Sequence, residues 1–182
     1  RASMTRPATV RALEPRSRSQ AAQQLAVLAL VSAAAAYGAA MLSPVQEAAR
    51  AGLNLTDNRM ALLQGAAVAA PMALASVPVG MMIDRWSRVR LIRGFMLLLL
   101  LGTWLTAIAP NFATLFVARA CVGLAVPALG IAGLSLVADL YPASQRGRAM
   151  MVTQTAFLAG RSAAFALGGF ALARLGDAPD AW

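Results

Sequence analysis

The chain has 182 residues, of which 59% are hydrophobic and 13% are charged. Soluble domains carry more charge and fewer long apolar runs, so this composition favours a membrane protein. The net charge of +9 raises the alternative of a nucleic-acid-binding protein. The arginines, however, flank apolar runs, and no basic face with interleaved aromatic residues is present, so we expect no nucleic-acid partner.

Metal and disulfide chemistry have few candidate residues in this chain. It has no histidine and a single cysteine, Cys121, which lies inside an apolar run. This inventory excludes a disulfide framework and a His/Cys metal cluster, so we expect no metal and no cofactor. We interpret Cys121 as a small packed apolar residue.

The ends of the chain differ from its middle. Residues 1–24 are polar and arginine-rich, and Pro7 and Pro15 would break a long helix, so we expect a disordered cytoplasmic arm. The chain begins at Arg1, although Met4 is a possible native start, and it ends at Trp182 after a polar turn. We therefore expect a fragment of a longer reading frame that lacks a sixth helix.

Five apolar runs, each of about 20 residues or more, are long enough to cross a bilayer as helices. The predicted helices cover residues 25–43, 60–83, 91–109, 112–140 and 149–173. The first run also resembles a secretory signal peptide, but the further runs favour an uncleaved helix. Thr56-Asp57, just before the second run, supplies a capping signal, and Pro71 and Pro78 within the run predict a kink.

The arginines are distributed unevenly between the two sides of these runs. Eleven of the 16 lie in the amino-terminal arm, in the segment Asp84–Arg93 that includes the start of the third run, or in the loop after the fourth run. By the positive-inside rule, these three segments and the amino terminus are cytoplasmic. We expect a multi-pass protein of the bacterial inner membrane that is surrounded by lipid.

The loop between the second and third runs has the pattern Gly-x-x-x-Asp-Arg-x-x-Arg-x-Arg. The residues that carry it are Gly80, Asp84, Arg85, Arg88 and Arg90. This pattern resembles motif A of the major facilitator superfamily, although Ser87 and Val89 replace a usual glycine and a usual base. The resemblance implies that the glycine lets two helices approach and that the charges form a cytoplasmic network. It also implies that Asp139, at the end of the fourth run, pairs with the motif A arginines, with Arg88 as the candidate.

Two arginines lie inside apolar runs, where a charge is costly and should face a cavity or a partner. Arg119 with Gly123 resembles motif B of the same family, in which the arginine faces the central cavity; Val122 replaces a usual glutamine. For Arg119, snorkelling to the outer headgroups is the alternative. Arg161 lies deeper in its run, among glycines that resemble a degenerate motif C. These glycines are Gly160, Gly168 and Gly169, and we expect them, together with Gly123, to pack against other helices.

The resemblance covers residues 25–182. The motif A loop and the runs Leu53-Asn-Leu55-Thr-Asp57 and Ala138-Asp139-Leu140-Tyr141-Pro142 resemble the spinster-like branch of the family most. It implies an all-α membrane protein that forms five helices of an amino-terminal six-helix bundle. The implied function is that of a secondary transporter that moves a small solute by alternating access and is coupled to an ion. The resemblance also implies a carboxy-terminal half of the same protein, which would be the partner of this bundle. Because both intramembrane charges are positive, we hypothesise a partly anionic substrate. The alternative is a complete five-helix subunit without its own transport activity. No acid lies in the interior of any run, so an intramembrane enzyme is not expected.

Overall fold

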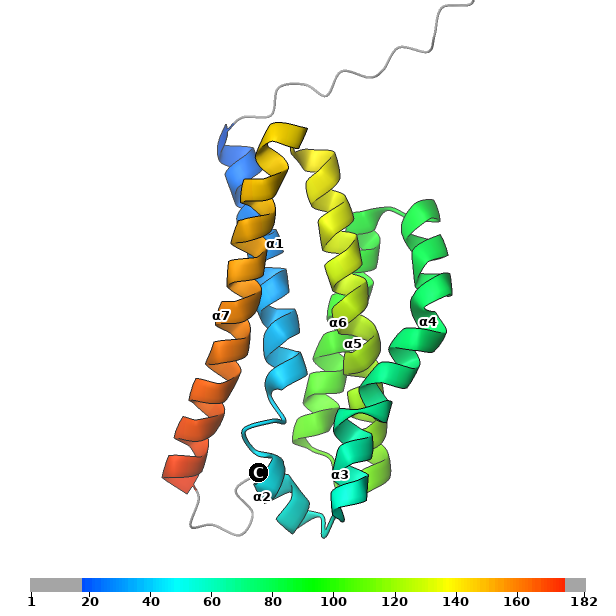
Figure 1. The fold of residues 1–182 in the computed structure, drawn as a ribbon, viewed down its shortest axis with the longest axis vertical. Coiled ribbons are helices and arrows are strands. Elements are labelled where there is room, and N and C mark those ends of the chain that lie inside the picture. The colour runs from blue at the N-terminus through cyan, green and yellow to red at the C-terminus, as the bar shows by residue number, and fades with distance from the viewer. Residues whose placement is uncertain (1–17, 176–182) are drawn as a thin grey trace, which may run out of the picture.

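The computed structural model describes the backbone of residues 18–175 (Figure 1). Within this range it does not describe the side chains of Arg18, Ile83, Asp84 and Leu175. The helices are α1 (Arg18–Ala40), α2 (Gln46–Gly52), α3 (Asp57–Gln64), α4 (Ala66–Arg85), α5 (Arg88–Ala107), α6 (Phe112–Leu140) and α7 (Ala143–Leu175). Five spans in this part of the chain are long and apolar enough to cross a membrane. The predicted all-α fold with five membrane helices is therefore confirmed.

Helix α1 begins earlier than the sequence predicted. Residues 18–24 are helical, so the prediction of a disordered arm over residues 1–24 was wrong for these seven residues. Residues 1–17 lie outside the described part of the chain. Alanine and glutamine are good helix formers, and no proline interrupts this segment. In addition, the hydroxyl of Tyr141 donates a hydrogen bond of 2.7 Å to the carbonyl of Ala21. This contact anchors the added turns of α1 to the turn that follows α6.

The second predicted span is two helices. Helix α3 ends at Gln64, and α4 begins at Ala66 after Gly65, whose φ and ψ of −96° and −83° are not helical. Glycine has a low helix propensity, which explains why the chain bends at this residue. Pro71 and Pro78 lie inside the continuous α4. The predicted cap is confirmed, since the side chain of Thr56 accepts a hydrogen bond from the backbone N–H of Arg59.

The remaining helices lie at the predicted spans, with shifts of a few residues at some of their ends. Helix α6 has the predicted bounds, and α5 begins three residues early and ends two early. Helix α7 begins at Ala143 rather than at residue 149, because Pro142 ends the preceding turn and its carbonyl accepts from the N–H of Gln145 and of Arg146. The short helix α2 lies between the first and second predicted spans, where the sequence analysis predicted no helix.

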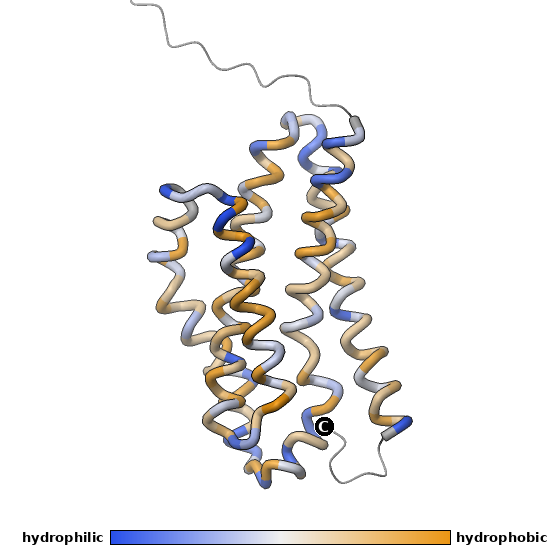
Figure 2. The backbone as a smooth tube through the Cα atoms, turned by 180° about the vertical axis from the view of Figure 1, so that it is seen from behind, coloured by the Kyte–Doolittle hydropathy of each residue, from blue (hydrophilic) through white to orange (hydrophobic). Residues whose placement is uncertain are grey.

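Helix α6 is the centre of the bundle and contacts α1, α3, α4, α5 and α7. Helices α1 and α7 run side by side along one flank, and α5 packs along α6 (Figure 1). Small residues of α6, such as Ala125, Ala128 and Ala132, are buried in the core between these helices. Figure 2 shows apolar residues along the shafts of the helices and more hydrophilic residues toward their ends, as a bilayer requires.

Three of the predicted packing glycines lie where helices approach closely. A Cβ atom added to Gly123 would lie 2.5 Å from the Cα of Val68 in α4, and one added to Gly160 would lie 2.1 Å from the carbonyl oxygen of Ala33 in α1. A Cβ on Gly168 would lie 2.4 Å from the Pro44 ring. At these positions only glycine allows the observed backbone distance.

The expectation of close packing does not hold for two other glycines within the described chain. A Cβ added to Gly80 or to Gly169 would meet no atom within 4 Å. Gly80 lies near the end of α4, which packs chiefly on α6 and touches α5 only slightly. Gly169 is an exposed neighbour of Gly168, and consecutive helical residues point about 100° apart, so only one of them can face the same partner. The sequence analysis did not identify Gly102 as a packing glycine, although a Cβ added there would lie 2.9 Å from the carbonyl oxygen of Ala118.

Candidate functional site: a charged end and two cavities along α6

One end of the bundle carries the α4–α5 turn, the α6–α7 turn and the start of α1 (Figure 1). We call it the arginine-rich end. Here a guanidinium nitrogen of Arg88 pairs with a carboxylate oxygen of Asp139. The pair joins the first residue of α5 to the last turn of α6, so the structure brings together the two residues that the motif suggested. Arg88 Nε is buried and forms no hydrogen bond with a described residue.

Arg146 strengthens the same end of the bundle. Its Nη2 donates to the carbonyl of Ala138 at 2.8 Å, and its Nε donates to the carbonyl of Tyr141 at 3.0 Å. The last carbonyls of a helix lack intrahelical partners and carry partial negative charge, so an arginine is a favourable cap there. Arg146 therefore ties the start of α7 to the end of α6, next to the ion pair of Asp139.

The other motif A residues do not join this ion pair. Arg85 is exposed at the end of α4. Arg90 is also exposed, and its Nε donates to the Ser87 hydroxyl at 2.9 Å. The backbone of Asp84 belongs to α4, but its side chain lies outside the described part. The structure therefore brings together Arg88 and Asp139 and leaves Arg85 and Arg90 at the surface.

Arg119 lies in the interior of the bundle, where only 5% of its surface is exposed. Its Nη2 donates to the carbonyl of Ala39 at 3.0 Å, and its Nη1 donates to the carbonyl of Gly38 at 3.4 Å. Both carbonyls belong to the last turn of α1, which ends at Ala40. The buried guanidinium thus caps the negative end of a helix, and this arrangement offsets part of the cost of a charge in the membrane.

Arg161 lies on α7 and lines the same cavity as Arg119. This cavity of about 390 Å³ lies between the last turn of α1 and helices α3, α4, α6 and α7; its wall also includes Gln64, Met72 and Val126. Arg161 is exposed in this part of the chain. Neither arginine forms an ion pair with a described carboxylate. The cavity therefore has two positive side chains on its wall. The terminal nitrogens of Arg119 donate to helix carbonyls, while its buried Nε bonds no described residue, and Arg161 is exposed.

A second cavity of about 440 Å³ lies between α1, α6 and α7 and shares Val126 and Pro127 with the first. Gly130 lines it, and an added Cβ there would meet no atom within 4 Å, so this glycine leaves room rather than tightening a contact. The polar residues that line this second cavity include Gln154, which is exposed, and Ser32, whose hydroxyl donates to the carbonyl of Leu28. Our sequence analysis missed Gln154; the available signal was an amide inside an apolar run.

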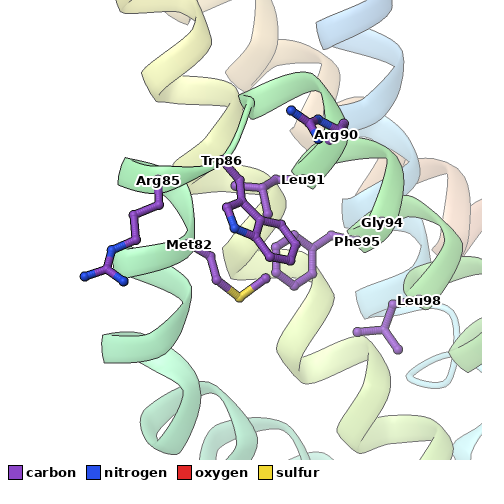
Figure 3. Close-up of a pocket in the computed structure, with 8 residues that line it drawn as sticks. All are labelled: Met82, Arg85, Trp86, Arg90, Leu91, Gly94, Phe95 and Leu98. Carbon is purple, nitrogen blue, oxygen red and sulfur yellow. The ribbon is translucent and has the colours of Figure 1, made fainter.

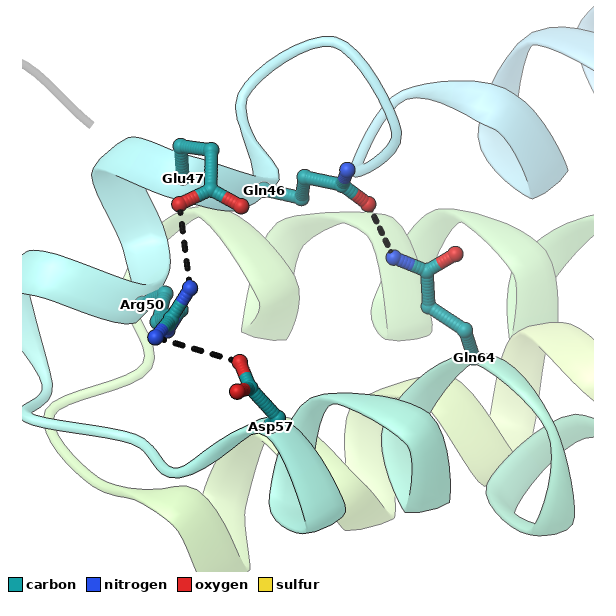
Figure 4. Close-up of polar contacts among 5 residues, drawn as sticks. All are labelled: Gln46, Glu47, Arg50, Asp57 and Gln64. Atoms are coloured by element: carbon teal, nitrogen blue, oxygen red, sulfur yellow. Dashed lines mark hydrogen bonds and ion pairs between the residues drawn. The ribbon is translucent and has the colours of Figure 1, made fainter.

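Helix α2 lies at the end of the bundle opposite the arginine-rich end (Figure 1), and Figure 4 shows its polar contacts with α3. Arg50 pairs with Glu47 at 3.4 Å and with Asp57 at 3.1 Å, and the side-chain amide of Gln64 donates to that of Gln46. These contacts tie α2 to α3. Since Gln64 also lines the cavity that contains Arg119, α2 is connected directly to the wall of that cavity.

A protein-family model supplies the identity of this arrangement. The model of the major facilitator superfamily matches residues 28–182, which is most of the chain. The chain belongs to the major facilitator superfamily. This superfamily consists of membrane transporters, so the prediction made from the motifs is confirmed at the level of the family.

Two solved structures of a bacterial homolog of the human lysosomal transporter Spinster have the same fold as this superfamily member. The inward-facing, unoccupied structure matches with a TM-score of 0.77 and 22% identity over 86% of this chain and 33% of the other. The inward-facing, occupied structure matches with a TM-score of 0.78 and 22% identity over 88% and 35%. At this identity the likeness concerns the fold, and the chain spans about a third of those proteins. No curated protein sequence matches the chain significantly.

Proposed function

We propose that this chain is part of a secondary transporter that moves a small, partly anionic solute by alternating access, coupled to an ion gradient. One observation carries the proposal: the two intramembrane arginines line one cavity, which adjoins a second cavity along α6. Adjoining cavities along a central helix are a reasonable path for a solute between two sides of a membrane. The remaining part of the transporter would supply the facing wall.

The anionic character of the substrate follows from the different surroundings of the two arginines. Arg119 already donates to two carbonyls of α1. Arg161 faces the cavity and is paired with no described carboxylate. A positive charge in a membrane cavity favours a negatively charged ligand, and the planar guanidinium suits a carboxylate or a phosphate. We therefore assign substrate contact to Arg161 and helix positioning to Arg119.

The test is transport by the full-length protein in proteoliposomes against a panel of anionic, neutral and cationic solutes. We expect anionic solutes to be moved, Arg161→Lys to weaken their binding, and Arg161→Ala to weaken it further. Arg174→Ala is a matched control, because Arg174 lies on the same helix and stacks over the Phe170 ring at 5.0 Å instead of lining the cavity. If only neutral or cationic solutes move and Arg161→Ala moves them normally, the anionic assignment is wrong. If nothing on the panel moves, the alternative of a subunit without its own transport activity gains support.

The arginine-rich end is proposed to be cytoplasmic and to act as a latch that stabilises one conformation. The support is the ion pair between Arg88 and Asp139, which joins two helices beside both cytoplasmic turns. We include Asp84 and Arg85 in the latch on the basis of the motif. Asp84→Asn should reduce the transport rate strongly while membrane insertion stays normal. Unchanged transport by this variant would rule out a role of Asp84 in the latch.

A further inference from the structure

A groove of about 500 Å³ lies at the arginine-rich end between the last turns of α4 and the first turns of α5 (Figure 3). It is separate from the two cavities along α6 and shares no lining residue with them. Its floor is apolar and is formed by Met82, Leu91, Phe95 and Leu98. The volume is in the range of sites that bind small ligands in proteins.

The rim of the groove is basic and carries an interfacial aromatic residue. Arg85 and Arg90 line the rim and are exposed, and Trp86 between the two helices is 59% exposed. Figure 3 shows Arg85 pointing outward from α4 and Arg90 near the turn. The bond from Arg90 Nε to the Ser87 hydroxyl holds this guanidinium at the turn and uses neither of its two terminal nitrogens. Among the lining residues that the structure describes, none is acidic.

This combination suits one class of occupant. Tryptophan favours the headgroup level of a bilayer, and basic pockets between membrane helices on the cytoplasmic side attract anionic headgroups. An acyl chain would cover the apolar floor, and the phosphate would lie against the guanidinium groups, which bind phosphate with good geometry. A helix packed over the groove would instead bury both arginines, and the described lining offers no acid to compensate them.

We propose that the groove between α4 and α5 binds an anionic phospholipid of the cytoplasmic leaflet. Its phosphate lies at the basic rim beside Arg90, one acyl chain lies beside Trp86 over Phe95, and Arg85 adds positive charge on the α4 side. The site is distinct from the solute path proposed above, so it exists whether or not the anionic substrate is correct. The lipid would lie near the start of α5, where Arg88 pairs with Asp139 of α6.

The fluorescence of Trp86 gives a direct test. In the full-length chain, every other tryptophan is replaced by phenylalanine, and the protein is reconstituted with phosphatidylglycerol or phosphatidylcholine that carries bromine on its acyl chains. Bromine quenches a tryptophan only at short range. Each arginine near an anionic surface favours binding by about fivefold. We therefore expect brominated phosphatidylglycerol to quench Trp86 at a mole fraction about fivefold or more below that needed with brominated phosphatidylcholine.

Two variants separate a specific site from general contact with lipid. The double variant Arg85→Gln and Arg90→Gln should quench equally with both lipids. Arg93→Gln should retain the preference, because Arg93 is an exposed arginine of α5 that does not line the groove. Equal quenching of the parent protein by the two lipids would refute the anionic site. An absence of quenching by either lipid would show that another segment covers the groove, which would also overturn the proposal.

Discussion

The substitution Gly160→Ala tests the closest backbone approach found at any described glycine. The added Cβ would lie 2.1 Å from the carbonyl oxygen and 2.7 Å from the Cα of Ala33. Ordinary contacts of this kind begin at 3.4 Å, and the opposing atoms are backbone atoms that cannot rotate away. Helices α1 and α7 must therefore separate locally by about 1 Å, which loosens the flank of the bundle beside the second cavity.

The size of the effect follows from the cost of overpacking. Inserting a methyl group into a tightly packed contact costs about 1–3 kcal/mol. For a chain of this size, 1 kcal/mol lowers the Tm by about 2–4 °C. We expect Gly160→Ala to lower the temperature at which this bundle unfolds, within the purified full-length protein in detergent, by about 2–12 °C. The measurement is thermal unfolding with size-exclusion detection.

Gly169→Ala is the matched control on the same helix. A Cβ at Gly169 would meet no described atom within 4 Å, and alanine has the higher helix propensity, so the Tm should stay the same or rise slightly. Equal Tm values for Gly160→Ala and the wild type would refute the close contact between α1 and α7. A large loss of stability in Gly169→Ala would show that a further segment covers this face of α7.

Three further predictions concern the charges and the topology. Replacing Arg88 by Asp and Asp139 by Arg together should restore part of the transport lost in each single variant. The side chains of Arg88 and Asp139 are 35% and 48% exposed, so a double-mutant cycle on stability should give a coupling of only about 0.2–1 kcal/mol. If the swapped double variant restores no transport, the pair has no role in transport. Cysteines placed at Ser87 and Asn58 in a cysteine-free background should react differently with an impermeant thiol reagent in intact cells, with only Asn58 labelled; the reverse pattern would invert the topology. Arg119→Gln should destabilise the protein by about 1.5–3 kcal/mol through the loss of charge-assisted bonds to the end of α1, and an unchanged Tm would show that these bonds contribute little.

The sequence by itself determined the number and approximate position of the membrane helices. A hydrocarbon core about 30 Å thick requires long apolar runs, so hydropathy alone defines the spans. The bounds of α6 were predicted correctly because Asn111 caps its start, with its side chain accepting from the N–H of Thr114, and Pro142 follows its end. The motif also pointed to Arg88 and Asp139, since both lie at ends of spans that must emerge on the same side.

Only the tertiary structure decided what each interior residue contacts. The sequence placed Arg119 at a costly depth but left its partner open, because the carbonyls of Gly38 and Ala39 are about 80 residues away in the chain and become available only where α1 ends. The glycines show the same limit. A Cβ added to Gly160 would meet the backbone of Ala33, whereas one added to Gly169 would meet no described atom within 4 Å. A close approach depends on where two helices cross, and this crossing involves residues far apart in the chain, so local spacing does not predict it.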